Sequence, residues 1–120
     1  MKWNFKSGQP IYQQIMTQLR LAVASGDLRP GGKLPPVREL AQEAGVNPNT
    51  MQRALTELER DGLLYTERTS GRYVTDDDRL LSRLKEDQAR EYVEELFEKL
   101  RQLGMTDAQI IAYVEKYTGK

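Results

Sequence analysis

Proline and glycine divide the first half of this chain into short segments, which limits what it can fold into. Pro10 precedes a pattern of apolar residues at helical spacing that ends at Gly26. The stretch RPGGKLPP at 29–36 cannot be helical, and it indicates a turn with a very short strand near Lys33 and Leu34. Two further short helices are predicted, the second from about Val37 to Ala44 with its stop at Gly45, and the third from Pro48 to about Arg60 with its end at Asp61 and Gly62.

The hydrophobic period changes after these helices. Residues 63–68 and 72–75 are rich in β-forming side chains and alternate apolar with polar. Residues 69–71 between them form a short turn in which Gly71 can take a positive φ, so a β-hairpin is predicted. The order helix, short strand, helix, tight turn, helix, hairpin is that of a winged helix-turn-helix domain. The expected fold class is therefore α+β and mostly α.

The third helix has a clear start signal. With Asn47 as its N-cap, Pro48 occupies the first helical position, where a missing N–H group costs nothing. Val46 can then pack against Met51 and fix the direction in which the chain enters the helix. At 100° per residue, the apolar stripe of this helix leaves an outer face that holds Asn49, Arg53, Thr56 and Arg60, with Thr50 and Gln52 beside it.

This outer face carries amides, hydroxyls and guanidinium groups, which are the groups that bind base edges in a major groove. A plain polar helix surface would explain the same residues taken alone, but the helix before it and the hairpin after it favour DNA. Arg38 begins the second helix, a place that often contacts the phosphate backbone. Arg68 and Arg72 flank the hairpin tip, and Arg72 is expected to contact DNA; a solvated charge pair of the hairpin is the alternative there. A surface ion pair with a nearby glutamate is the alternative for Arg38. The tip residues Thr69, Ser70 and Gly71 are small enough to approach a minor groove.

Composition excludes several functions. The chain has no histidine and no cysteine, so it lacks an imidazole base, a thiolate nucleophile and nitrogen or sulfur metal ligands, and an enzyme is not expected. The absence of cysteine fits a cytoplasmic protein, and no apolar run is long enough for a secretory signal or a membrane span. Residues 1–75 hold 10 Lys and Arg against 7 Asp and Glu, and residues 76–120 hold 8 against 11. This asymmetry indicates a basic front half that faces a polyanion, although composition scatter would also explain it.

The remaining residues, 76–120, predict a two-helix tail. A long helical pattern reaches Gly104, and a last helix starts at Thr106 with a capping box to Gln109. We expect domains at 1–75 and 76–120. Two helices cannot enclose a core, so we expect them to pack against the same helices of a second subunit; folding back onto the front domain is the alternative. The residues expected in this homodimer interface are Leu80, Leu81, Leu84, Tyr92, Val93, Leu96, Phe97, Leu100, Ile110, Ile111 and Val114.

The stretch LPPVRELAQEAGVNPNTMQRALTELERDGLL, followed by RTSGRYV, resembles the winged-helix domain of GntR-type bacterial transcription regulators. That family's pattern is roughly Leu-Pro-Ser-x-Arg-Glu-Leu-Ala, Val-x-x-x-Thr-Val and Ala-x-x-x-Leu, then a glycine-rich wing that ends in an aromatic residue and valine. PIYQQI at 10–15, the VNPNT turn and the short tail are similar to the YtrA-like subfamily. The resemblance covers about residues 8–117.

The resemblance implies a DNA-binding regulator that represses a nearby operon, often one that encodes an ABC transporter. Larger relatives carry an effector-binding domain, for which this tail is too short, so whether an effector binds stays open. The implied partners are double-stranded DNA and a second copy of the chain, with no membrane, cofactor, metal or catalytic residue. The positions that the family uses to contact DNA correspond here to Arg38, Asn47, Asn49, Thr50, Gln52 and Arg53, and to Gly71 at the wing tip.

Three departures from the family pattern affect these contacts. Pro36 replaces the usual serine, Pro48 stands where some relatives carry a base-reading arginine, and residues 69–72 replace the commoner Arg-Gly-x-Gly wing. Recognition should therefore depend on the residues beside Pro48. Two other functions remain open, a winged helix that docks on protein through its third helix and a small-molecule sensor with a pocket between the tail helices.

Overall fold

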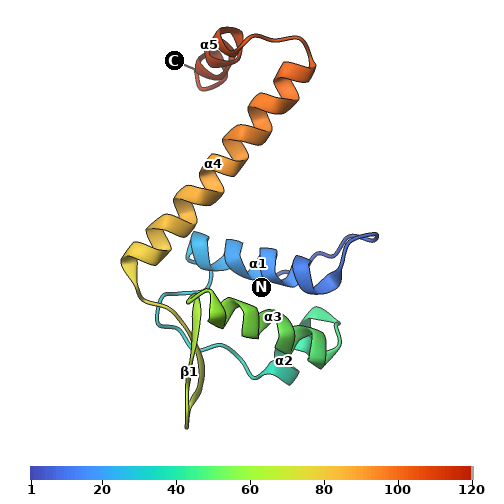
Figure 1. Ribbon diagram of the computed structural model, residues 1–120, viewed down its shortest axis with the longest axis vertical. Coiled ribbons are helices and arrows are strands. Elements are labelled where there is room, and N and C mark those ends of the chain that lie inside the picture. Colours follow the sequence, from blue (N-terminus) through green and yellow to red (C-terminus); the bar gives the residue numbers. More distant parts are fainter. Residues whose placement is uncertain (120) are drawn as a thin grey trace. The chain divides into compact units, whose positions relative to one another are not determined.

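A computed structural model describes residues 1–119, which form five helices and one antiparallel hairpin (Figure 1). Two compact units are present, Met1–Lys85 and the residues from Glu86 onward, and α4 contributes to both. Lys120, the last residue of the predicted tail, lies outside the described part. The elements are α1 (Ile11–Ser25), α2 (Val37–Ala44), α3 (Pro48–Arg60), β1 (Leu64–Glu67), β2 (Gly71–Val74), α4 (Asp78–Gln102) and α5 (Asp107–Tyr117).

The three helices predicted in the front half are confirmed, and the turn between α2 and α3 has the expected capping. Gly45 ends α2 with a φ of 71°, in the left-handed region that favours glycine. Val46 then donates its N–H to the carbonyl of Ala41 at 2.9 Å. The Asn47 side chain accepts a hydrogen bond from the N–H of Asn49 at 2.8 Å, and Pro48 is the first residue of α3. The angle between the two helices is thus set by local contacts around this turn.

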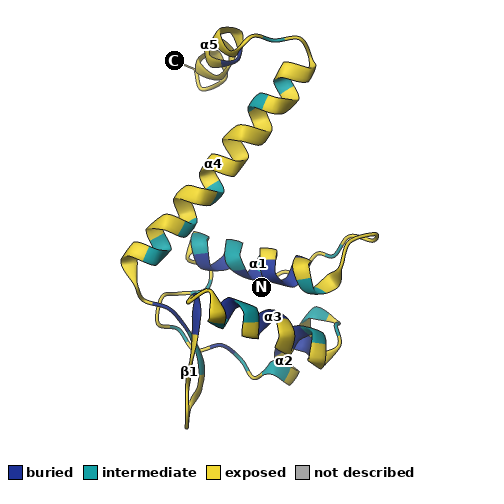
Figure 2. Cartoon of the chain, in the orientation of Figure 1, coloured by how far each residue is buried: buried dark blue, intermediate teal, exposed yellow. Residues whose placement is uncertain are grey.

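The core of the first unit lies between α1 and α3, with α2 and the hairpin beside them (Figure 1). Figure 2 shows buried residues on the faces of α1 and α3 that look toward each other. Five of these side chains are almost completely excluded from water, and each stabilises the fold by roughly 1.5–3 kcal/mol. They are Ile15, Leu19, Met51, Leu55 and Leu58.

An N-terminal arm, residues 1–9, is held on this core by aromatic and amide contacts. Trp3 and Phe5 stack with ring centroids 5.9 Å apart and pack against the core. The side-chain amide of Gln14, on α1, accepts from the Lys6 N–H at 2.8 Å and donates back to the Lys6 carbonyl at 2.8 Å. Gln18 bonds both backbone groups of Asn4 in the same way. These contacts fix the arm along the surface of α1.

The predicted hairpin is confirmed, but its loop lies one residue earlier than expected. The Ser70 N–H bonds the Glu67 carbonyl at 3.2 Å, so the loop contains Arg68, Thr69 and Ser70. Gly71 is already a strand residue opposite Glu67, and its φ of 127° is one that other residues rarely adopt. The very short strand expected near Lys33 is present, and it pairs with Tyr73 of β2, a partner that the sequence did not indicate.

The second unit contains the rest of α4 and all of α5. The capping box at the start of α5 is confirmed by bonds in both directions between Thr106 and Gln109. Arg101 makes two hydrogen bonds to Asp107, at 2.8 and 2.9 Å; they raise the pKa of Arg101 and hold the pKa of Asp107 below its usual value. No helix in the described residues is both long enough and apolar enough to cross a membrane.

Candidate nucleic-acid interface

The outward surface of α3 is polar, as predicted. Asn49, Gln52, Arg53 and Thr56 are exposed, and Thr50 is half-buried. The buried stripe of the same helix keeps these side chains directed away from the core. The helix therefore presents amide, hydroxyl and guanidinium groups near its N-terminus.

Gln52 and Arg53 have different surroundings although they are adjacent in sequence. The Arg53 guanidinium lies 4.0 Å from the centroid of the Tyr12 ring, on α1, in cation–π geometry. The Gln52 amide lines a groove beside the wing and donates to the Thr56 hydroxyl at 3.2 Å. A turn of 100° per residue explains this divergence. Helical spacing alone had grouped Arg53 with Thr56, and it could not show the contact with Tyr12, 41 residues away.

Arg72 of the wing is held by α3. Its Nε donates to the Glu59 carboxylate at 2.6 Å, and the Thr66 hydroxyl donates to the same oxygen. The side chains of Arg72 and Glu59 are 17% and 28% exposed, so this pair is partly shielded from water. Burial alone would raise the pKa of Glu59, but the hydrogen bonds from Thr66 and Arg72 and the charge of Arg72 outweigh it and lower that pKa.

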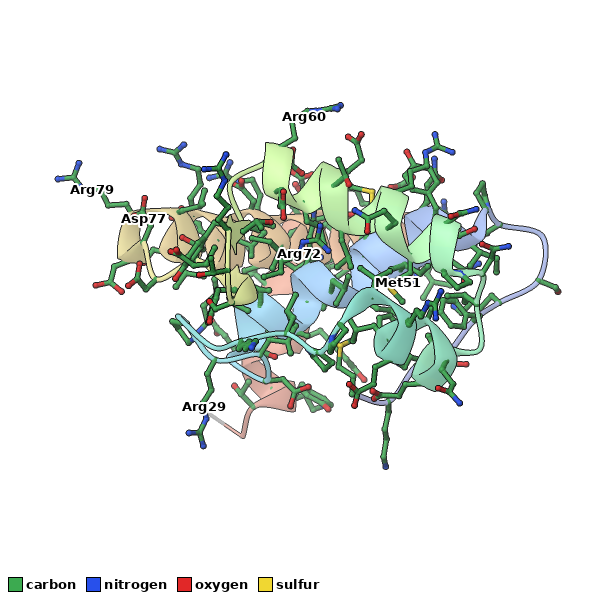
Figure 3. The ribbon with its side chains drawn as sticks, turned by 90° about the horizontal axis from the view of Figure 1, so that it is seen from below. Arg29, Met51, Arg60, Arg72, Asp77 and Arg79 are labelled. Atoms are coloured by element: carbon green, nitrogen blue, oxygen red, sulfur yellow. The ribbon has the colours of Figure 1, made fainter. Side chains whose placement is uncertain are left out.

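The two side chains that close the hairpin over α3 thus come from facing strands. Thr66 and Arg72 are cross-strand partners in the register of the hairpin. In Figure 3 Arg72, on β2, lies in the middle of the view, whereas Arg60, on α3, extends outward at its edge. The sequence placed Arg72 beside the wing tip with a surface ion pair as the alternative, but it could not identify Glu59 as the partner.

An open groove of about 290 Å³ lies between the start of α2, α3 and the wing. We call it the wing groove. Its walls bring together residues from three parts of the chain that are distant in sequence, namely the segment 33–37, α3 and the hairpin. The lining residues are Lys33, Leu34, Pro35, Pro36, Val37, Gln52, Thr66, Ser70, Gly71 and Arg72.

Lys33 is the residue of this groove that sequence reasoning missed. Its short strand was predicted, but only the pairing of that strand with Tyr73 brings Lys33 to the wing. Three other residues near the groove that were predicted to contact DNA are exposed, namely Arg38, Thr69 and Ser70. Ser70 also shares a hydrogen bond with the Tyr73 hydroxyl at 2.7 Å. Among the described residues, no group of acidic side chains could hold a metal ion.

The residues predicted for the dimer interface fall into two groups. Leu80, Leu81 and Leu84 pack partly against the core of their own first unit, the outcome that the sequence left as an alternative for the tail. Ile110 is fully buried within the single chain. The others lie in the second unit and are exposed or half-buried, namely Tyr92, Val93, Leu96, Phe97, Leu100, Ile111 and Val114.

The sequence of this chain matches that of known regulatory proteins. The family described as "Bacterial regulatory proteins, gntR family" matches residues 11–74. The chain is 36% identical over 115 residues to the uncharacterized HTH-type transcriptional regulator YhcF of Bacillus subtilis, covering 96% of this chain and 95% of YhcF. It is 45% identical over 71 residues to the HTH-type transcriptional repressor YtrA of B. subtilis, covering 59% of this chain and 55% of YtrA.

Solved structures are similar to this fold. A GntR family transcriptional regulator from Listeria monocytogenes has a TM-score of 0.84 at 39% identity, covering 93% of this chain and 98% of that one. The AraR DNA-binding domain in complex with operator ORX1 has a TM-score of 0.56 at 28% identity, covering 62% of this chain and 96% of that one. The winged helix and the helices after it are thus an arrangement found in transcriptional regulators.

Proposed function

The chain belongs to the gntR family of bacterial regulatory proteins, and from this premise we propose that it is a repressor that binds an inverted-repeat operator as a homodimer. The family's role is DNA binding for the regulation of transcription, which is not an enzymatic role. We also propose that the protein acts in the cytoplasm and controls a nearby operon, one that encodes a transporter. The relative YtrA is named a transcriptional repressor, which supports repression over activation.

The observation that carries the proposal is the polar N-terminal half of α3, presented beside the wing. Asn49 and Gln52 are exposed there, and amides can bond adenine in two places at once. The backbone N–H groups at the start of α3 can approach a phosphate. The AraR domain, whose fold is similar, was solved on its operator, and this supports operator binding by the winged helix here.

The proposed DNA contacts have different roles. Arg38, at the start of α2, binds a DNA phosphate. Asn47 caps α3 with its side-chain oxygen, while its amide nitrogen faces the DNA backbone. Asn49, Thr50 and Gln52 read bases. Arg53 contacts DNA from its position over the Tyr12 ring. The wing tip, Thr69 to Gly71, lies along the minor groove.

The proposed dimer forms through the second unit. Tyr92, Val93 and Leu96 of α4 are 51%, 53% and 42% exposed, and a monomer rarely leaves large apolar side chains so uncovered over one segment. Ile111 and Val114 of α5 are exposed as well. A two-fold dimer covers equivalent faces of both chains and sets two α3 helices about one turn of DNA apart.

The test is selection of bound sequences from a random library of duplexes. We expect enrichment of one inverted repeat with half-sites about one helical turn apart. The same repeat should occur upstream of genes adjacent to the one that encodes this chain. Absence of enrichment at moderate salt, where nonspecific binding is weakened, would refute sequence-specific DNA binding.

A further inference from the structure

The wing groove has two cationic side chains on its walls, Lys33 and Arg72. They come from neighbouring strands, Lys33 from the short strand and Arg72 from β2, with which that short strand pairs. If this groove faces DNA, either charge is positioned to contact a phosphate. Which of the two side chains is free to do so depends on its ion pairs and its exposure.

Arg72 is neutralised within the chain. The Glu59 carboxylate accepts from its Nε at 2.6 Å, and the arginine side chain is only 17% exposed. To reach a phosphate, Arg72 would have to leave this partly shielded partner. An arginine that keeps its carboxylate partner adds no net charge, so it displaces no counterion from DNA.

Lys33 has the opposite character. It is exposed, and it makes no ion pair with any of the described residues. Its backbone is fixed by the bridge to Tyr73 and by the next residue, Leu34, whose N–H bonds the Arg72 carbonyl at 2.8 Å. The side chain runs beside Gly71: a Cβ added to Gly71 would lie 3.1 Å from the Lys33 Cε. The glycine thus leaves space for the lysine to lie along the wing.

We propose that Lys33, and not Arg72, supplies the cationic contact between the wing groove and a DNA phosphate. Arg72 acts as a positioning residue that fixes the wing to α3 through Glu59. This inference rests on the proposed DNA-binding function and assigns its wing contact. It replaces the expectation from sequence that Arg72 itself touches DNA.

The salt dependence of binding tests this assignment, because each phosphate contact adds about 0.9 to the slope of log K against log salt. The probe is the duplex of about 30 base pairs that carries the selected inverted repeat. We expect Lys33→Gln to lower the slope by about 0.9 for each bound protomer. Between about 50 and 200 mM salt, the wild type should lose about 3.5-fold more affinity per protomer than this variant. Lys33→Arg should keep the wild-type slope.

Two matched variants separate the contact from general charge effects. Arg29→Gln removes one charge from the same loop, but Arg29 does not line the groove and points away from the molecule in Figure 3, so the slope should stay unchanged. The double variant Glu59→Gln, Arg72→Gln removes both charges of this pair at constant net charge. The two amides can still hydrogen-bond each other and keep the wing on α3, so the slope should also stay unchanged. Circular dichroism of each variant checks that it is folded.

Two results would overturn the proposal. One is an unchanged slope for folded Lys33→Gln, and the other is a fall of about 0.9 for the double variant. Failure of the wild type to select any duplex is a separate result that counts against the proposed function itself. The two kinds of failure are therefore distinguishable.

Discussion

Replacement of Glu59 by glutamine tests whether a charge on α3 holds the wing. Glutamine keeps the shape and can still accept from Arg72 and Thr66, so the variant removes only the charge. Charged hydrogen bonds contribute about 1.5–3 kcal/mol and neutral ones about 0.5–1.5 kcal/mol. The hydrogen bond to Arg72 is 2.6 Å long and partly shielded from water. We therefore assign about 1 kcal/mol of the lost stability to this bond and a smaller part to the bond from Thr66. We expect Glu59→Gln to lower the free energy of unfolding by about 1.5 kcal/mol near pH 7.

Urea denaturation measures this loss. The single tryptophan, Trp3, packs against the core of the first unit, so its fluorescence reports the unfolding of that unit. Glu57→Gln is the matched control, because Glu57 lies on the same helix and pairs with Arg60, whose side chain is 71% exposed. Exposed ion pairs on one helix contribute about 0.5 kcal/mol or less to the free energy of unfolding.

The difference between wild type and Glu59→Gln should also depend on pH. The pKa of Glu59 is lower in the folded protein than its usual value. Its charge therefore stabilises the fold above about pH 4.3, the pKa of a free glutamate, and this contribution is lost as the pH falls through the folded pKa. The two proteins should converge in stability as the pH falls below the folded pKa of Glu59. A loss no larger than that of Glu57→Gln, or one that persists undiminished in acid, would refute the reasoning.

Three further predictions concern the DNA and dimer surfaces. Arg38→Ala and Arg53→Ala should each weaken binding of the selected duplex by about tenfold without unfolding the protein, and unchanged gel-shift affinity of a folded double variant would remove both from the interface. Asn47→Ala should lower the free energy of unfolding, measured by thermal denaturation, by about 1 kcal/mol, because the bond that caps α3 at the Asn49 N–H is lost. Asn49→Ala is the control, because the Asn49 side chain caps no helix. Leu96→Asp should reduce the mass seen by light scattering from two chains to one, and a variant that stays dimeric would place the interface elsewhere.

Local patterns determined much of this fold. Pro10, Gly45 and Pro48 mark helix ends in any tertiary context, because they act through their own φ and their own missing or permitted backbone groups. The bounds of α2 and α3 accordingly agree with those expected from sequence. The capping box at Thr106 is equally local and is equally well predicted. The polar outer face of α3 followed from the spacing of its apolar residues.

Tertiary structure decided which charges are available at the candidate site. Glu59 and Arg72 are 13 residues apart, and Arg53 and Tyr12 are 41 apart, so no helical or strand period relates the partners. Their pairing depends on how the hairpin and α1 pack around α3. Lys33 reaches the wing because a bridge to Tyr73 adds its short strand to the hairpin. The sequence by itself determined that a polar helix and a wing lie side by side in this protein. The packing alone decided that Arg72 is neutralised and Lys33 is not, because a charge is available to DNA only if no neighbour in the fold has already bound it.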